Sequence, residues 1–355
     1  MAEQHPLPPN ALSSFETIRT LLQGKRPVVF LDYDGTLAPI VKRPDQAFMT
    51  DTMRAAVKNV AQKFVTAVVS GRSTQKVVNF VKLDELFYAG SHGLDITGPN
   101  WPLADRTSGG GATSNDDDTT GDTPGDTPGD TTGDTTGDVT GAAAANEGSS
   151  TVESENKENN DNTRKSGLSS QPVKHRVAQT FLPVLNSCRG RILTSINATL
   201  GADSNVEIED NLLTFSVHYR NAVNCSAEEV RKVIDDVLID SEYTDQLVCT
   251  AGKMVYEVRP QVQWNKGAAV LWLLETLGMN AEDNVIALYL GDDITDEDAF
   301  RALSESSWKG RCASIVVQGE LDRKNGAMHR PTSALWSLKD TIEVQQFLEL
   351  LSMIG

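Results

Sequence analysis

Short apolar runs alternate with helical patterns along much of the chain. Helical patterns, in which apolar residues recur every three or four positions, lie for example at residues 52–62 and 266–277. The apolar runs are typical of buried strands and lie at residues 28–31, 64–69, 86–89, 285–290 and 314–317. Continuous apolar strands that alternate with helices predict an α/β fold, in which helices cover both faces of a parallel sheet.

The pattern changes between residues 172 and 258. Residues 206–210 and 211–220 predict a β-hairpin with an Asp210-Asn211 turn, residues 227–238 an amphipathic helix, and residues 247–260 further strand. We therefore expect an α+β cap over residues 172–258, inserted into a core made of residues 27–104 and 259–355. Residues 1–26 form an N-terminal extension with a helix. A cap in this position can close over a site in the core.

Residues 105–171 differ in composition from the rest of the chain. They repeat the tetrad Thr-x-Gly-Asp from Thr119 through Asp138 and contain no aromatic residue. Such a segment cannot bury enough apolar surface to offset its ordering entropy. The repeat lacks both the Glu-terminated loop of a calcium site and the apolar residues of a β-solenoid. We expect a disordered acidic insert.

Charge and cysteine content exclude several classes of partner. The formal net charge is −17, and 14 carboxylates against four basic residues place −10 of it between residues 105 and 170. The remainder is only mildly acidic, so we expect no nucleic acid partner. The four cysteines are far apart without metal-type spacing, which predicts reduced cysteines in a cytoplasmic protein. No apolar run is long enough to span a bilayer, and residues 1–10 lack the pattern of a secretory signal, so we expect no membrane contact.

The first predicted strand ends in two carboxylates. Residues 28–31 are followed directly by Asp32-Tyr33-Asp34-Gly35-Thr36. In open α/β sheets, ligands bind at the carboxyl ends of parallel strands. Two carboxylates there can carry out nucleophilic and acid–base chemistry on a phosphate if a cation neutralises their charge. A strand that simply ends in an Asp/Gly turn is the alternative.

Two further motifs can contact a phosphoryl group. Ser70-Gly71-Arg72 follows an apolar strand, and its hydroxyl and backbone N–H groups can donate to phosphoryl oxygens, although a simple Ser-Gly turn accounts for the same residues. Lys266 stands where a helix begins, a place in which the helix dipole disfavours a cation. This mismatch favours a lysine that pairs with a phosphate and a carboxylate over a solvated one.

An acidic stretch at residues 291–298 follows the strand predicted at 285–290. Its four aspartates and one glutamate would repel one another without a cation, and Mg²⁺ is the natural ion for oxygen ligands. An acidic first turn of a helix is the alternative, and both interpretations can hold together. We expect Asp292 to face the ion, with Asp293 and Asp296 in support.

The order of these motifs resembles the haloacid dehalogenase superfamily of phosphoryl-transfer enzymes. Further stretches resemble trehalose-6-phosphate phosphatases, in particular their plant-type branch: residues 31–37, 45–49, 80–86, 88–94, 217–220, 252–260 and 291–300. The resemblance covers residues 27–350 outside the insert, which is foreign to the family. It implies a Rossmann-like parallel-sheet core of the haloacid dehalogenase type with an inserted α+β cap.

The resemblance also implies a mechanism. Asp32 would attack phosphorus to form an aspartyl-phosphate, and Asp34 would act first as general acid and then as general base. Mg²⁺ would be the cofactor, held by Asp32, the Asp34 carbonyl and Asp292. Lys266 and Ser70 would clamp the transferring group.

Substrate contacts are expected from the loops of the core and from the cap strands. Cross-strand pairs at the surface are the alternative for the cap residues. Where plant-type members often carry two basic residues in a row, residues 252–254 keep only Lys253. The residues expected to contact substrate are Thr36, Gly71, Arg72, His92, Gly93, His218, Arg220, Lys253 and Glu257.

The activity implied is hydrolysis of trehalose 6-phosphate, the final step of trehalose biosynthesis, with a functional link to trehalose-6-phosphate synthase. One alternative keeps the core chemistry but acts on another sugar phosphate, such as sucrose 6-phosphate or a mannosyl phosphoglycerate. A catalytically silent sugar-phosphate sensor is a third hypothesis. It would require loss of at least one of Asp32, Asp34, Lys266 and Asp292, and all four are present.

Overall fold

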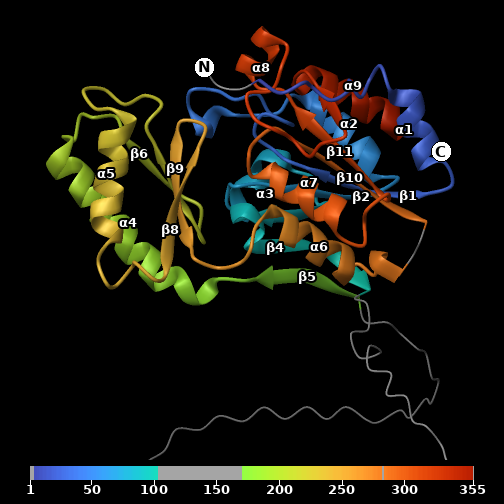
Figure 1. Ribbon diagram of the computed structural model, residues 1–355. Helices are drawn as coiled ribbons and strands as arrows, with labels where there is room; N and C mark the ends of the chain where they lie inside the picture. Colours follow the sequence, from blue (N-terminus) through green and yellow to red (C-terminus); the bar gives the residue numbers. More distant parts are fainter. Residues whose placement is uncertain (1–3, 103–169, 282–283, 355) are drawn as a thin grey trace, which may run out of the picture. The chain divides into compact units, whose positions relative to one another are not determined.

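A mixed sheet of eight strands forms the core of the computed structural model, which describes residues 4–102, 170–281 and 284–354 (Figure 1). The strand order is β12-β11-β10-β1-β2-β3-β4-β5, parallel from β12 to β3 and antiparallel for β4 and β5. All five strands predicted from apolar runs lie in the parallel part, which confirms the α/β prediction. The strands are β1 (Arg26–Leu31), β2 (Val65–Val69), β3 (Phe87–Gly90), β4 (Asp95–Pro102), β5 (Ser170–Arg176), β10 (Val285–Gly291), β11 (Cys312–Val317) and β12 (Trp336–Leu338).

Helices cover both faces of this sheet because its strands are apolar on both sides. In β1, Val29 and Leu31 pack on one face, whereas Val28 and Phe30 pack on the other. The first face is covered by α1 (Phe15–Leu22), α2 (Asp51–Ala61), α3 (Thr74–Val81) and α9 (Thr341–Ser352). The second is covered by α6 (Lys266–Thr276) and α7 (Asp296–Glu305), while α8 (Glu320–Asn325) is a short helix after β11. This arrangement leaves the carboxyl ends of the central strands as the place for a site.

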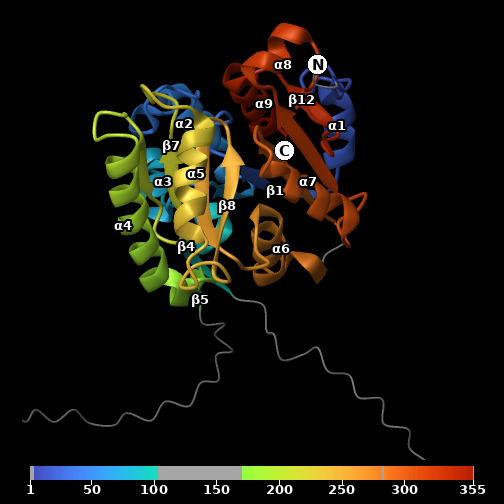
Figure 2. The ribbon, with the colours of Figure 1, turned by 60° about the vertical axis from the view of Figure 1, so that its left-hand side comes forward.

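A smaller antiparallel sheet carries its own core. Its strand order is β6-β7-β9-β8, and two helices, α4 (Leu182–Thr199) and α5 (Ala227–Leu238), pack against it (Figure 2). A capping box between Ser226 and Glu229 starts α5 at the residue predicted. The predicted α+β character of this region is thereby confirmed. The strands are β6 (Glu207–Asp210), β7 (Phe215–His218), β8 (Leu247–Gly252) and β9 (Val255–Pro260).

Two details of the cap prediction are wrong. Residues 211–214 form the hairpin connection between β6 and β7, in place of a two-residue Asp210-Asn211 turn, and Leu212 adopts a φ of 68° there. Residues 172–176 belong to β5 of the large sheet, so the chain enters the smaller sheet later than residue 172. The start of the cap was misplaced because β5 pairs with β4, from which the insert separates it in the sequence.

Residues 105–171 were predicted to be disordered, and residues 105–169 of this segment lie outside the described residues. Residues 170 and 171 begin β5. All four cysteines are free thiols, three of them buried. Among the helices in the described ranges, none has both the length and the apolar character needed to cross a membrane.

Candidate active site

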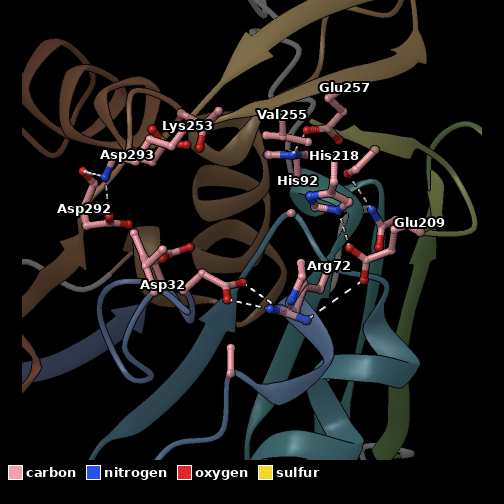
Figure 3. A pocket seen from close by; sticks show the side chains of 18 of the residues that line it. Asp32, Arg72, His92, Glu209, His218, Lys253, Val255, Glu257, Asp292 and Asp293 are labelled. Carbon is pink, nitrogen blue, oxygen red and sulfur yellow. Dashed lines mark hydrogen bonds and ion pairs between the residues drawn. The ribbon is translucent and has the colours of Figure 1, made fainter. Parts of the chain in front are cut away.

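Loops at the carboxyl ends of β1, β2 and β10 meet strands β6, β7 and β9 of the smaller sheet around one pocket (Figure 3). The pocket collects 12 of the 16 residues predicted for the site: Asp32, Asp34, Gly71, Arg72, His92, His218, Arg220, Lys253, Glu257, Lys266, Asp292 and Asp293. The other four, Thr36, Ser70, Gly93 and Asp296, do not line it. Residues from four distant parts of the sequence are thereby brought together.

A buried lysine joins two carboxylates at the floor of the pocket. The Lys266 Nζ donates to Asp32 Oδ1 at 2.7 Å and to Asp296 Oδ1 at 2.6 Å, and the lysine is only 3% exposed. Tyr289 adds a hydroxyl donor to the same Asp296 oxygen at 2.8 Å. Although burial opposes the charged form, Asp296 and Asp32 raise the pKa of Lys266 well above its usual value. The lysine is therefore a fixed cation beside Asp32.

Three carboxylates come close enough to share a cation. Asp32, Asp292 and Asp296 are buried, and each offers an oxygen within 4.8 Å of the others. Burial, together with neighbouring carboxylates, raises the pKa of Asp32 well above its usual range and that of Asp292 to about 6. Gly35, with a φ of 81°, makes room for this group, because a Cβ there would lie 2.3 Å from Asp292 Oδ2. The oxygen-only donor set fits a hard divalent ion.

The second carboxylate of the DxD motif is bound by Arg72. The guanidinium donates from Nε to Asp34 Oδ2 and from Nη2 to Asp34 Oδ1, both at 2.7 Å. Arg72 is buried, and its Nη1 has no hydrogen-bond partner but lies 4.0 Å from Glu209 Oε1 on β6. Both Asp34 oxygens are thus bound by one guanidinium group, whose third nitrogen faces the cap.

The remaining phosphate-binding candidates lie in the loops that follow β1 and β2. Ser70 Oγ is buried and accepts from the Arg72 backbone N–H at 3.2 Å. Thr36 is fully buried, and its Oγ1 has no hydrogen-bond partner. Gly71 lets His92 approach, because a Cβ there would lie 2.7 Å from the imidazole Nε2. The Thr36 hydroxyl is the one group of this set that still needs a partner.

Gly93 packs against α6 instead of lining the pocket. It adopts a φ of 88°, and a Cβ there would lie 2.3 Å from the Ala269 Cβ. Its carbonyl accepts from the Trp264 indole at 2.8 Å. The preceding Ser91 and His92 also adopt positive φ, which is unusual for residues with side chains and fixes the loop that presents His92.

Polar side chains of the cap close the pocket from the other side. Lys253, at the end of the β8–β9 hairpin, hydrogen-bonds to both the carbonyl and the carboxylate of Asp292. Glu257 of β9 hydrogen-bonds to His92 Nε2 at 2.5 Å. Burial opposes ionisation of Glu257, but His92 outweighs it and lowers the pKa of that carboxyl. Arg220 donates to the Lys253 carbonyl at 3.0 Å.

Glu209, which was not among the residues predicted from the sequence, lies at the centre of the contacts between cap and core. Its carboxylate binds His218 Nε2 at 2.8 Å (Figure 3). It also binds Lys76 Nζ of α3 at 2.9 Å. Burial alone would raise the pKa of Glu209, but the hydrogen bonds from His218 and Lys76 outweigh burial and lower the pKa to about 2. One signal was available: Glu209 pairs with Ser216 across the hairpin, and Ser216 shares a face with His218 two residues later.

The chain is similar in sequence to trehalose-phosphate phosphatases. The profile of the trehalose-phosphatase family matches residues 30–106 and 143–341. A probable trehalose-phosphate phosphatase 2 of Oryza sativa subsp. japonica is 38% identical over 97% of this chain and 72% of its own length. Trehalose-phosphate phosphatase B of Arabidopsis thaliana is 34% identical over 97% of this chain and 71% of its own length.

A solved structure shares the fold. The C-terminal domain of trehalose-6-phosphate phosphatase from C. albicans superposes with a TM-score of 0.62 at 18% identity, covering 99% of this chain and 98% of that one. The expected α/β fold of the haloacid dehalogenase type, with an α+β module inserted in the core, is confirmed.

Proposed function

Because the chain belongs to the trehalose-phosphatase family, we propose that it hydrolyses trehalose 6-phosphate to trehalose and phosphate, the final step of trehalose biosynthesis. It is a phosphomonoester hydrolase. One observation carries the proposal: Asp32 at the end of β1, with Lys266 Nζ at 2.7 Å, lies at the floor of a pocket that polar cap residues close.

We assign the nucleophile to Asp32. Its Oδ1 is bound by Lys266, which leaves Oδ2 for attack on phosphorus and formation of the aspartyl-phosphate. Lys266 also lies where it can neutralise a phosphoryl oxygen, since Asp296, which accepts a hydrogen bond from the Tyr289 hydroxyl, fixes its ammonium group. The unpartnered Thr36 hydroxyl, the Ser70 side chain and the Gly71 backbone complete a set of donors for the transferring group.

Asp34 is assigned as general acid and base, as the sequence predicted. In the Arg72-bound form both carboxylate oxygens accept hydrogen bonds, so Asp34 is ready to take a proton from the water that hydrolyses the intermediate. To protonate the leaving sugar oxygen, one Asp34 oxygen must carry a proton and so must release its donor on Arg72. Arg72 is thus assigned to position Asp34, in addition to the substrate contact expected from the sequence.

Mg²⁺ is proposed as the cofactor. Asp32, the Asp34 carbonyl and Asp292 would hold the ion, with Asp293 and Asp296 in support. When bound, Mg²⁺ would neutralise the charge between the Asp32 carboxylate and the phosphoryl group. Among the supporting groups, Asp296 accepts the Asp293 backbone N–H at 2.8 Å and so shapes the loop that carries Asp292.

The sugar is proposed to bind between the core loops and the cap, residues 177–260. Lys253, Glu257, His218 and Arg220 line the pocket from the cap side, and His92 lines it from the core. Such a set offers both donors and acceptors to sugar hydroxyls. A cytoplasmic location and a functional link to trehalose-6-phosphate synthase also remain proposals; the four free thiols support the location.

A phosphate-release panel tests the proposed function. The purified chain with Mg²⁺ is incubated with trehalose 6-phosphate, sucrose 6-phosphate and glucose 6-phosphate, and kcat/KM is compared. Trehalose 6-phosphate should exceed the other two by at least about tenfold, because each hydroxyl bound by a buried polar group adds discrimination. Faster release from sucrose 6-phosphate would assign the same chemistry to another sugar.

A further inference from the structure

A second cavity adjoins the catalytic pocket behind Lys266. The two cavities share His92, Glu257, Lys266 and Thr295 in their walls. Lys266 holds the proposed nucleophile on one side and lines the second cavity on the other. We name this cavity the arginine chamber, since Arg259 of β9 and Arg330 of the loop before β12 line it.

Unpartnered polar atoms are concentrated in the arginine chamber. In the described part of the chain, nine buried side-chain nitrogen or oxygen atoms have no hydrogen-bond partner. Four of the nine belong to residues that line this chamber: two donors, the Nε atoms of Arg259 and Arg330, and two acceptors, the Oε1 atoms of Glu257 and Glu297. Buried polar groups without partners are costly, so the chamber is suited to a polar guest.

Three of the four cationic side chains that line the chamber are already paired with carboxylates. Lys266 binds Asp32 and Asp296, Arg301 binds Asp298, and Arg330 lies 3.7 Å from Glu297, whereas Arg259 has no ion pair with a described residue. Each carboxylate already has a cationic or imidazole neighbour: His92 for Glu257, Arg330 for Glu297 and Arg301 for Asp298.

Arg259 is the lining cation that can bind a guest. Its guanidinium makes no ion pair with any described residue, and its Nη1 donates to the Trp264 carbonyl at 3.2 Å. The side chain is partly exposed, but its buried Nε–H has no hydrogen-bond partner and is therefore available to an anion.

The start of α6 also lines the chamber. Asn265, the N-cap residue, and Lys266, the first residue of the helix, both line the chamber. The first turn of this 11-residue helix contains no acidic residue, so its dipole is not neutralised there. A helix N-terminus beside an unpaired arginine favours an oxyanion.

We propose that the arginine chamber binds inorganic phosphate, the product of the reaction. The oxygens of the phosphate accept from the Nε atoms of Arg259 and Arg330, and its remaining P–OH donates to Glu257 or Glu297. Because His92, Glu257, Lys266 and Thr295 line both cavities, the chamber lies next to the place where the reaction would release phosphate. This inference rests on the proposed function for the origin of the phosphate, but the site itself does not require turnover.

Isothermal titration calorimetry of the whole chain with inorganic phosphate tests the chamber directly. With Mg²⁺ present, we expect two phosphates per chain, one in the catalytic pocket and one in the chamber. With a chelator, the catalytic pocket loses its ion, and one phosphate should remain bound. Arg259→Gln should weaken this metal-independent binding about tenfold or more, as expected for loss of a charge-assisted hydrogen bond.

Arg330→Gln gives the same test should Arg259→Gln fail to fold. Arg301→Gln is the matched control, because Arg301 lines the same chamber but is paired with Asp298 and half exposed. Absence of metal-independent phosphate binding, or binding that both variants leave unchanged, would overturn the proposal. Hydrolysis of trehalose 6-phosphate is measured separately, so a failed chamber and a failed function give different results.

Discussion

Arg72 binds both carboxylate oxygens of Asp34, with each nitrogen–oxygen distance 2.7 Å. The arginine is 7% exposed and lies against the rings of Tyr33 and Phe80, so its orientation is fixed. A group held in this way decides where the acid–base carboxylate points.

Arg72→Lys keeps the charge but removes the bidentate hydrogen bonds to Asp34. We expect kcat/KM for trehalose 6-phosphate to fall by about 10- to 100-fold, part of what a positioned general acid contributes. For p-nitrophenyl phosphate, whose leaving group departs without a proton, the fall should be within about threefold. Arg231→Lys, in a surface pair with Asp235, is the control. Equal losses for both substrates would assign Arg72 to phosphate binding alone.

Asp32→Asn should abolish phosphate release and yet stabilise the metal-free protein. Burial raises the pKa of Asp32 well above its usual range in the folded state, so this carboxyl group costs stability at neutral pH. Asparagine carries no charge, so the variant should have a larger free energy of unfolding than wild type. Urea titration with a chelator measures this. A variant less stable than the parent would show that the Lys266 ion pair outweighs the repulsion.

Mg²⁺ should raise Tm by relieving the same repulsion. We expect a clear rise in wild type, little or none in Asp292→Asn, and loss of turnover in chelator. Asp298→Asn is a suitable control, since this residue lies in the same acidic stretch but pairs with Arg301. A Tm that does not respond to Mg²⁺ in wild type would contradict the proposed metal site.

Glu209 should stabilise the fold at neutral pH, and this contribution should be lost in acid. Its pKa falls from 4.5 to about 2 in the folded state, so the contribution is complete above pH 4.5 and is lost as pH falls toward 2. Glu209→Gln should therefore be less stable than wild type by at most about 3 kcal/mol at pH 7, with the difference shrinking at pH 3. Urea unfolding at both values checks this. The exposed Glu207, two residues earlier on β6, serves as control through Glu207→Gln. A difference independent of pH would mean that packing, not charge, is lost.

The sequence predicted the catalytic floor well because each of its groups is local. Asp32, Ser70, Lys266 and Asp292 stand at strand ends or helix starts that apolar runs reveal. Glu209 was missed because its partner Lys76 lies 133 positions away, and no periodicity reports such a contact.

Strands β4 and β5 were missed for a related reason. Both strands contain proline, and β4 also contains glycine. Among the described strands, β5 pairs with β4, and β4 pairs with β5 and β3. Their strand character comes from tertiary pairing, which local propensity does not show.

The pairing of β4 with β5 makes the insert removable. Pro102 and Ser170, at the two ends of the insert, are paired in register, so a hairpin loop of about four residues can join these strands. We expect a chain in which residues 105–167 are replaced by a short Gly/Ser linker to keep kcat/KM for trehalose 6-phosphate within about threefold, because hairpin loops of different length leave the paired strands in place. A second deletion, of residues 105–171, also removes Ser170 and Gln171, which pair with Pro102 and Trp101. That deletion should lower Tm more than the first. Equal loss of stability in both would show that the insert itself supports the fold.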